Sequence, residues 1–196
     1  MRLITLLLTA VLSVSAYPDH DNHANVPTGS GAFVALMVQA RDADAYVEIL
    51  KTNPALFEAI GSSIAGACIT KTGRDYPGQM FIWNAFDSVE QAMTATDKYD
   101  PMKATPELTA IREVKYNVMF KPLKQFTLEP GSERLWRLNI SGENLQPFVN
   151  KIAELETALR TAGHKVNLGV FQPIGGGVHE AIHLRAVSPS YGASGK

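Results

Sequence analysis

The stretch QMFIWNAFDSVEQAM (Gln79–Met93) joins a strand pattern directly to a helix start. Its first eight residues are mostly large and apolar, which is typical of a strand buried on both faces. Ser88 and Gln91 have the spacing of a capping box, in which the serine hydroxyl and the glutamine side chain satisfy the first free amides of a helix. The stretch therefore predicts a strand over Gln79–Phe86 and a helix that begins immediately after Ser88.

Further strand and helix patterns lie before and after the Gln79–Met93 stretch. The other expected strands of the first half are Gly31–Ala40, Ile64–Lys71 and Arg112–Phe120. Helix patterns lie between the first and second strands and between the third and fourth. The order is βαββαβ, which is the ferredoxin-like arrangement. Alternation in the last strand places Val114, Tyr116, Val118 and Phe120 on one face and Lys115, Asn117 and Met119 on the other.

The pattern begins again after a connector. Strands are expected over Arg134–Ile140, Lys165–Gln172 and Val178–Val187, with an amphipathic helix between the first two. Asn144 is expected to cap that helix and Gly163 to end it. The two halves align at an offset near one hundred residues, so that Ser188 falls on Ser88. Ser188-Pro189 reads as another helix start, but the helix and fourth strand of the first half have no counterpart. The second half is either part of a fragment, which we favour, or open on one side.

A short motif near the end of the chain offers a different function. His179-Glu180-Ala181-Ile182-His183 fits H-E-x-x-H, which binds zinc when it lies on a helix. The glycines just before it favour a hairpin turn, and the repeat aligns it with a strand. Two imidazoles four residues apart on a strand stand ~13 Å apart, too far for one ion whose ligand bonds are ~2 Å. We therefore expect a strand and no metal site, and a zinc hydrolase is the alternative if the segment is helical.

The segment Phe81–Met93, with Trp83, Asn84 and Ser88 at positions common in the family, resembles the strand–Ser–helix segment of dimeric α+β barrel proteins. That superfamily includes antibiotic-biosynthesis-type monooxygenases and stress-response barrel domains. The resemblance covers Ala32 to about Val187. It implies two ferredoxin-like modules whose sheets face each other around a small ligand, here joined in one chain as a pseudo-dimeric barrel. It also implies oxygenation without a cofactor. Haem-degrading members carry a histidine after the third strand, where this chain has none, so no cofactor is expected.

These observations predict an α+β fold of two tandem ferredoxin-like modules with antiparallel sheets. Module 1 covers residues 32–121, a linker covers 122–133, and an incomplete module 2 covers 134–196. A small ligand between the sheets would contact the side chains that point away from the helices.

Candidate site residues follow from this alternation. In module 2 the apolar set is expected to pack on the helix and comprises Trp136, Leu138, Ile140, Val166, Leu168, Val170, Ile182 and Leu184. The opposite set comprises Arg137, Asn139, Asn167, Phe171, His179, His183 and Arg185. His183 is the candidate general base, since its unperturbed pKa is ~6.5, and Arg137 would stabilise an anion. Trp83, Asn139, Phe171, His179 and Arg185 are the candidate ligand contacts. One alternative is that this sheet face is simply turned to water. Another is a non-catalytic binding or interaction module that holds a ligand or a partner without turnover.

The N-terminus has the features of a secretory signal peptide. Arg2 precedes the apolar run Leu3–Leu12, and Val14-Ser15-Ala16 has the small-x-small pattern of a cleavage site. Residues 1–16 are therefore expected to be removed, and an uncleaved membrane anchor is the alternative. Residues 17–31 read as a flexible polar leader. The protein is expected to be periplasmic or secreted.

Composition narrows the class of partner. The formal net charge is −1 and no basic stripe is present, so nucleic acid is not expected. The single cysteine, Cys68, rules out an internal disulfide and reads as a small buried hydrophobe. His20 and His23 could form a metal-binding tail, but a solvated leader explains them as well. A small-molecule ligand is the expected partner, with no membrane contact after signal cleavage, and a homodimer is left open.

Overall fold

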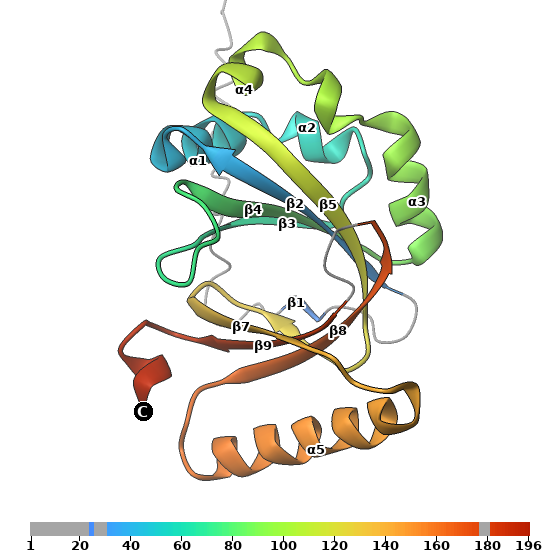
Figure 1. Cartoon of the computed structure of the whole chain (residues 1–196), viewed down its shortest axis with the longest axis vertical. Coiled ribbons are helices and arrows are strands. Elements are labelled where there is room, and N and C mark those ends of the chain that lie inside the picture. Colours follow the sequence, from blue (N-terminus) through green and yellow to red (C-terminus); the bar gives the residue numbers. More distant parts are fainter. Residues whose placement is uncertain (1–23, 26–30, 177–180) are drawn as a thin grey trace, which may run out of the picture.

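The computed structural model describes residues 24–25, 31–176 and 181–196. Its main element is a seven-stranded antiparallel sheet with the order β3-β4-β2-β5-β8-β9-β7. The sheet curls into a half-barrel, with helices on its outer side (Figure 1). The expected α+β class is confirmed. The predicted signal peptide, most of the leader and the predicted site residue His179 lie outside the described residues.

The first half of the sheet carries most of the helices. Its strands are β2 (Ala32–Ala40), β3 (Ile64–Ile69), β4 (Gln79–Phe86) and β5 (Arg112–Pro122), and its helices are α1 (Ala43–Thr52), α2 (Ala55–Glu58), α3 (Val89–Lys98), the 3-10 turn η1 (Pro101–Lys103) and α4 (Pro106–Ile111). β2 pairs with β4 on one side and β5 on the other. The helices cover one face of these strands, as Figure 1 shows.

The second half has a single long helix. Its elements are β7 (Ser132–Leu138), α5 (Gly142–Thr161), β8 (Asn167–Gly175), β9 (Ile182–Ser188) and the 3-10 turn η2 (Ala193–Gly195). β5 pairs with β8 and so joins the two halves into one sheet. Two short strands, β1 (Ala24–Asn25) and β6 (Thr127–Leu128), pair separately. In Figure 1, α5 lies on the opposite side of the molecule from α1–α4, with both half-sheets between them.

Side chains connect the β3–β4 connection to β7 and to the segment after β9. Arg137 on β7 lies 3.7 Å from Asp75 in the β3–β4 connection. The hydroxyls of Thr72 and Tyr191 are hydrogen-bonded at 3.0 Å, which ties the same connection to the segment after β9. We call this pair of contacts the seam. It brings the inner faces of the two half-sheets together without backbone pairing between β3 and β7 among the described strands.

The helix ends test the capping predictions. The Ser88 side chain accepts a hydrogen bond from the Gln91 amide and begins α3, as expected. Gly163 follows α5 with φ of +87°, a conformation that suits glycine, so the predicted stop is also confirmed. The predicted start of α5 is wrong, because Ser141 is the cap and Asn144 lies inside the helix. The interpretation of Ser188-Pro189 as a helix start is wrong too, since Ser188 ends β9 and a turn follows.

A bulge in β5 reverses one predicted face. Leu36 pairs with Asn117 and Met37 with Tyr116, but Val38 pairs with Val114, so Lys115 is an extra residue. A bulge shifts the alternation by one position. The residues Tyr116, Val118 and Phe120 therefore face the other half-sheet, whereas Val114, Asn117 and Met119 face the helices. The expectation that Val114 shares a face with Tyr116 is wrong for this reason.

Apolar clusters fill both faces of the sheet. In the second half, Val149 and Ile152 of α5 pack on Leu168, Val170 and Ile182, as the alternation predicts. Trp136, expected in the same cluster, is 42% exposed because it lies on the edge strand β7. On the inner face, a separate cluster contains Phe33, Val118, Phe120, Phe126 and Phe171, with Trp83 packed against it. The space between the half-sheets is thus largely occupied by side chains.

Candidate functional site

The space between the half-sheets brings three predicted site residues together. Arg137, His183 and Arg185 line one cavity of about 20 Å³, together with first-half residues such as Met37 and Phe81. A cavity of this size holds about one water molecule. The predicted polar group therefore exists as a cluster, but it has no room for an organic ligand in this conformation. We call it the interior cavity.

Arg185 is held by aromatic rings and one acid. Its guanidinium lies 5.3 Å from the ring centroids of Phe81 and Phe171 and 5.8 Å from that of Phe120. Glu133 Oε1 lies 3.3 Å from Arg185 Nη1, and both side chains are less than one-fifth exposed. A buried guanidinium with an adjacent carboxylate and π faces on several sides is electrostatically compensated. Arg185 Nε and Glu133 Oε1 are buried without a hydrogen-bond partner among the described residues, so the pair is held by charge and ring contacts alone.

His183 lies on β9 and is 7% exposed. Its ring centroid is 4.5 Å from that of Phe120. The other histidine of the motif, His179, is outside the described residues. The described part of the chain contains no group of three or more His, Cys, Asp or Glu side chains that could hold a metal ion.

Trp83 and Phe171 belong to a chain of aromatic contacts on the inner face. Phe33 makes edge-to-face contacts with both, at centroid distances of 6.1 Å to Trp83 and 5.3 Å to Phe171. Gly66 makes room for the indole, since a Cβ at Gly66 would lie 2.3 Å from Trp83 Cζ2. The two predicted ligand contacts are thus packed against neighbouring side chains.

Asn139 is not brought into the interior cavity. It is exposed, follows the last residue of β7, and lines an open depression with Ser141 and Gln172 near the start of α5. The predicted alternation fails there because β7 ends at Leu138, before Asn139.

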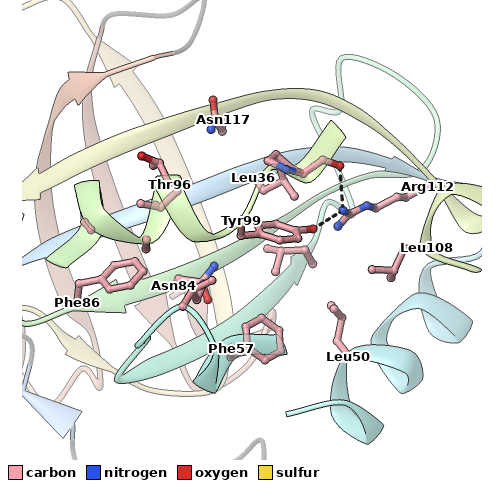
Figure 2. A pocket seen from close by; sticks show the side chains of 16 residues that line it. Leu36, Leu50, Phe57, Asn84, Phe86, Thr96, Tyr99, Leu108, Arg112 and Asn117 are labelled. Carbon is pink, nitrogen blue, oxygen red and sulfur yellow. Dashed lines mark hydrogen bonds between the residues drawn. The ribbon is translucent and has the colours of Figure 1, made fainter. Parts of the chain in front are cut away.

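A larger cavity lies on the other face, between the first half-sheet and its helices. It measures about 80 Å³, and we call it the helix-side cavity (Figure 2). Most of its walls are apolar and include Leu36, Leu50, Phe57, Ile82, Phe86 and Leu108. Strand alternation predicts only a helix-packed core there, so the sequence does not indicate this cavity.

Arg112 is the only cationic side chain among the residues described as lining this cavity. It begins β5, pairs with Ala40, and is 5% exposed. Its guanidinium donates hydrogen bonds to the hydroxyl of Tyr46, to that of Tyr99 at 2.7 Å, and to the carbonyl of Pro101 at 3.5 Å. Two of these bonds are drawn in Figure 2. The bonds drawn go to Tyr99 and Pro101 and connect the start of β5 to the segment after α3, whereas the bond to Tyr46 connects it to α1.

The Tyr46 partner is a neutral phenol at neutral pH. Burial raises the pKa of Tyr46 above its usual value of 10, although the Arg112 charge acts in the opposite direction. The same neighbours raise the pKa of Arg112, with burial opposing them. Arg112 is therefore a cation among neutral acceptors.

Two asparagines add polar groups to the cavity wall. Asn84 lies on β4, and its Oδ1 is buried and accepts no hydrogen bond from the described residues. Asn117 reaches the cavity because the bulge at Lys115 turns it toward the helices. The sequence shows an arginine at the start of a strand and an asparagine within an apolar strand. Hydrophobic periodicity does not predict that either residue lines a cavity.

Comparison with known proteins assigns no relative. No family model matches the chain, and no curated protein matches it. In the described part of the chain, no helix is long and apolar enough to cross a membrane.

Proposed function

We propose that the protein binds a small, largely apolar organic molecule in the helix-side cavity. The supporting observation is a cavity with apolar walls that is lined by a buried arginine and by a partly buried asparagine whose Oδ1 atom is buried. Ligand sites commonly combine an apolar surface with a few fixed polar groups. The cavity volume of about 80 Å³, against about 20 Å³ for the interior cavity, means that the ligand is small or extends outward.

Polar groups distinguish this cavity from a packing defect. Empty cavities in proteins are apolar, whereas buried polar atoms require a partner. Asn84 Oδ1 lacks one among the described residues. A bound molecule with a hydrogen-bond donor would satisfy it.

The strand order supports the broader family proposal. β3-β4-β2-β5 and β8-β9-β7 each follow the order expected for a ferredoxin-like unit, with the fourth strand absent from the second. We infer two tandem modules of the dimeric α+β barrel kind, facing each other through the interior cavity. Export to the periplasm or the medium is proposed from residues 1–16 alone.

A second candidate function is oxygenation without a cofactor, in which the organic substrate itself reduces dioxygen. It is favoured by the meeting of Arg137, His183 and Arg185 at one cavity. The seam would have to open to admit a substrate. Dioxygen uptake with an easily oxidised phenol tests it, and uptake should be lost in His183→Gln. Uptake no faster than without protein would exclude it.

Filling the helix-side cavity tests the main proposal. Ala95 on α3 lines the cavity and is 5% exposed, so Ala95→Leu places three extra carbons in that space. Butanol, butyramide and butyrate are titrated at millimolar concentration while amide resonances of α3 are followed by NMR. At least one ligand should give saturable shifts in the wild type, and Ala95→Leu should remove them.

A matched variant separates cavity filling from general disruption. Ala85 lies in the inner-face cluster, is 3% exposed, and does not line the cavity. Ala85→Leu should cost about 1–3 kcal/mol by overpacking but leave binding intact, whereas Ala95→Leu should cost less. Failure of all three ligands to bind the wild type, or equal binding by Ala95→Leu, would refute the proposed site.

A further inference from the structure

Buried cations in this protein are normally paired with a carboxylate. Arg185 lies beside Glu133, and Lys124, whose side chain is 9% exposed, forms an ion pair with Glu156. Arg112 is as deeply buried as either of them. Among the described residues, no carboxylate forms an ion pair with Arg112, and its acceptors are two phenols and a carbonyl.

An uncompensated buried cation is unfavourable. Removing a charge from water costs free energy that neutral hydrogen-bond acceptors recover only in part. Tyr46 cannot act as a counter-anion near neutral pH, since burial raises its pKa. The arrangement is therefore suited to an anion that arrives from outside.

The Arg112 guanidinium has more N–H donors than the hydrogen bonds described for it, and it borders a cavity. An arginine has five N–H groups, and three hydrogen bonds to described groups account for three of them. Arg112 also lines the helix-side cavity, as Figure 2 shows. An anionic group in that cavity would meet a fixed positive charge held in position by Tyr46 and Tyr99.

The walls restrict the type of anion. They offer one cation and mainly hydrocarbon, which suits a single negative charge attached to an apolar chain better than a phosphate with two charges. The volume of about 80 Å³ restricts the chain to a few carbons inside the cavity. A short-chain carboxylic acid meets both conditions.

We propose that Arg112 anchors the carboxylate of a short-chain monocarboxylic acid whose apolar chain occupies the helix-side cavity. This inference rests on the proposed ligand-binding function and specifies the chemical class of its ligand. Asn84, on β4 of the same cavity, offers a polar contact for a substituent on the chain.

The test compares an acid with its amide of nearly equal size. Butyrate and butyramide are titrated against the wild type, Arg112→Gln and Arg112→Lys, and dissociation constants are taken from NMR shifts. The wild type should prefer butyrate at least tenfold. Arg112→Gln should remove the preference, and Arg112→Lys should retain most of it because the charge is kept. A purely structural role for Arg112 would alter both ligands equally.

Arg41→Gln is the matched control. Arg41 is exposed, and its guanidinium donates to the Ala110 carbonyl at 2.8 Å outside the cavity lining. Its substitution should leave the acid-to-amide ratio unchanged. If Arg112→Gln fails to fold, the Nε–H resonance of Arg112 in the wild type provides the readout, and it should move with butyrate but not with butyramide.

The outcomes separate the two proposals. Equal affinity of the wild type for butyrate and butyramide, or a preference that survives in Arg112→Gln, overturns the carboxylate inference while ligand binding stands. Absence of binding by butanol, butyramide and butyrate overturns ligand binding itself, and the inference with it.

Discussion

The two faces of the sheet each bury an arginine, but they treat its charge differently. Arg185, on the inner face, has Glu133 at 3.3 Å, three phenyl rings around it, and a cavity of about 20 Å³ beside it. Arg112, on the helix face, has neutral acceptors and a cavity of about 80 Å³. The first arrangement is closed and compensated, whereas the second has both a free charge and free space.

The difference indicates which face is structural and which is suited to binding. A compensated ion pair without adjacent space has little to offer a ligand, because any new anion must displace Glu133. An uncompensated cation beside a cavity gains free energy when an anion binds. We therefore assign the inner face mainly to holding the half-sheets together and the helix face to ligand binding.

Removing the compensating acid should have the largest effect. Glu133→Gln keeps the size of the side chain but leaves Arg185 buried without a counter-charge, and breaking a buried pair costs about 3–5 kcal/mol. Arg112→Gln should cost less, about 1–3 kcal/mol, because hydrogen bonds but no ion pair are lost. The free energy of unfolding in urea measures both.

An exposed acid provides the control for Glu133. Glu48 pairs with Lys51 at 2.8 Å and is 65% exposed, so Glu48→Gln should change stability by less than about 1 kcal/mol. If Glu133→Gln costs no more than this, the inner face is hydrated and the contrast between the two arginines fails.

The reactivity of Cys68 measures how closed the inner face is. Burial raises the pKa of this thiol from 9 to about 12, with the nearby Glu133 charge acting in the same direction. At pH 8 the thiolate fraction is then roughly 1,000-fold lower than for a thiol of pKa 9. Cys68 is only partly buried, contrary to the expectation of a buried hydrophobe, so alkylation by iodoacetamide should be slower in the native protein than in urea by at most about this factor. Because Cys68 is the only cysteine, the labelled site is unambiguous.

The raised pKa of Cys68 also makes the free energy of unfolding depend on pH. The folded-state pKa is raised, so the contribution of Cys68 is fully present below pH 9 and is lost as the pH rises through about 12. Cys68→Ala should therefore lose less stability than the wild type between these values. Native alkylation within tenfold of the denatured rate would instead mean that the thiol is readily accessible.

Local patterns in the sequence predicted the elements of this fold well. The apolar run at Gln79–Phe86 and the cap at Ser88 match β4 and the start of α3, because both depend on neighbouring residues alone. The cap of α5 was misplaced since Ser141 and Asn144 are both good capping residues and only the packing of the helix distinguishes them.

The candidate sites depend on features that periodicity does not contain. Alternation correctly grouped Arg137, His183 and Arg185, but the aromatic rings that fill the space around them come from distant strands. The helix-side cavity depends on the bulge at Lys115 and on how the helices α1–α4 pack against the sheet. Neither can be read from one segment of sequence, so the burial of Arg112 could not be predicted.

The smallest expected effect concerns the seam. Arg137 and Asp75 are 3.7 Å apart with side chains 30% and 53% exposed, so Asp75→Asn should cost only about 0.2–1 kcal/mol. This contact joins β7 to the β3–β4 connection. Its loss should therefore lower the free energy needed to open the inner face to solvent. Cys68 alkylation should accelerate by a factor of about 1.4 to 5, which corresponds to this free energy. Glu154→Gln breaks an exposed pair with Lys151 on α5 and should leave that rate unchanged. Equal acceleration in both variants would mean that the seam does not control access to the inner face.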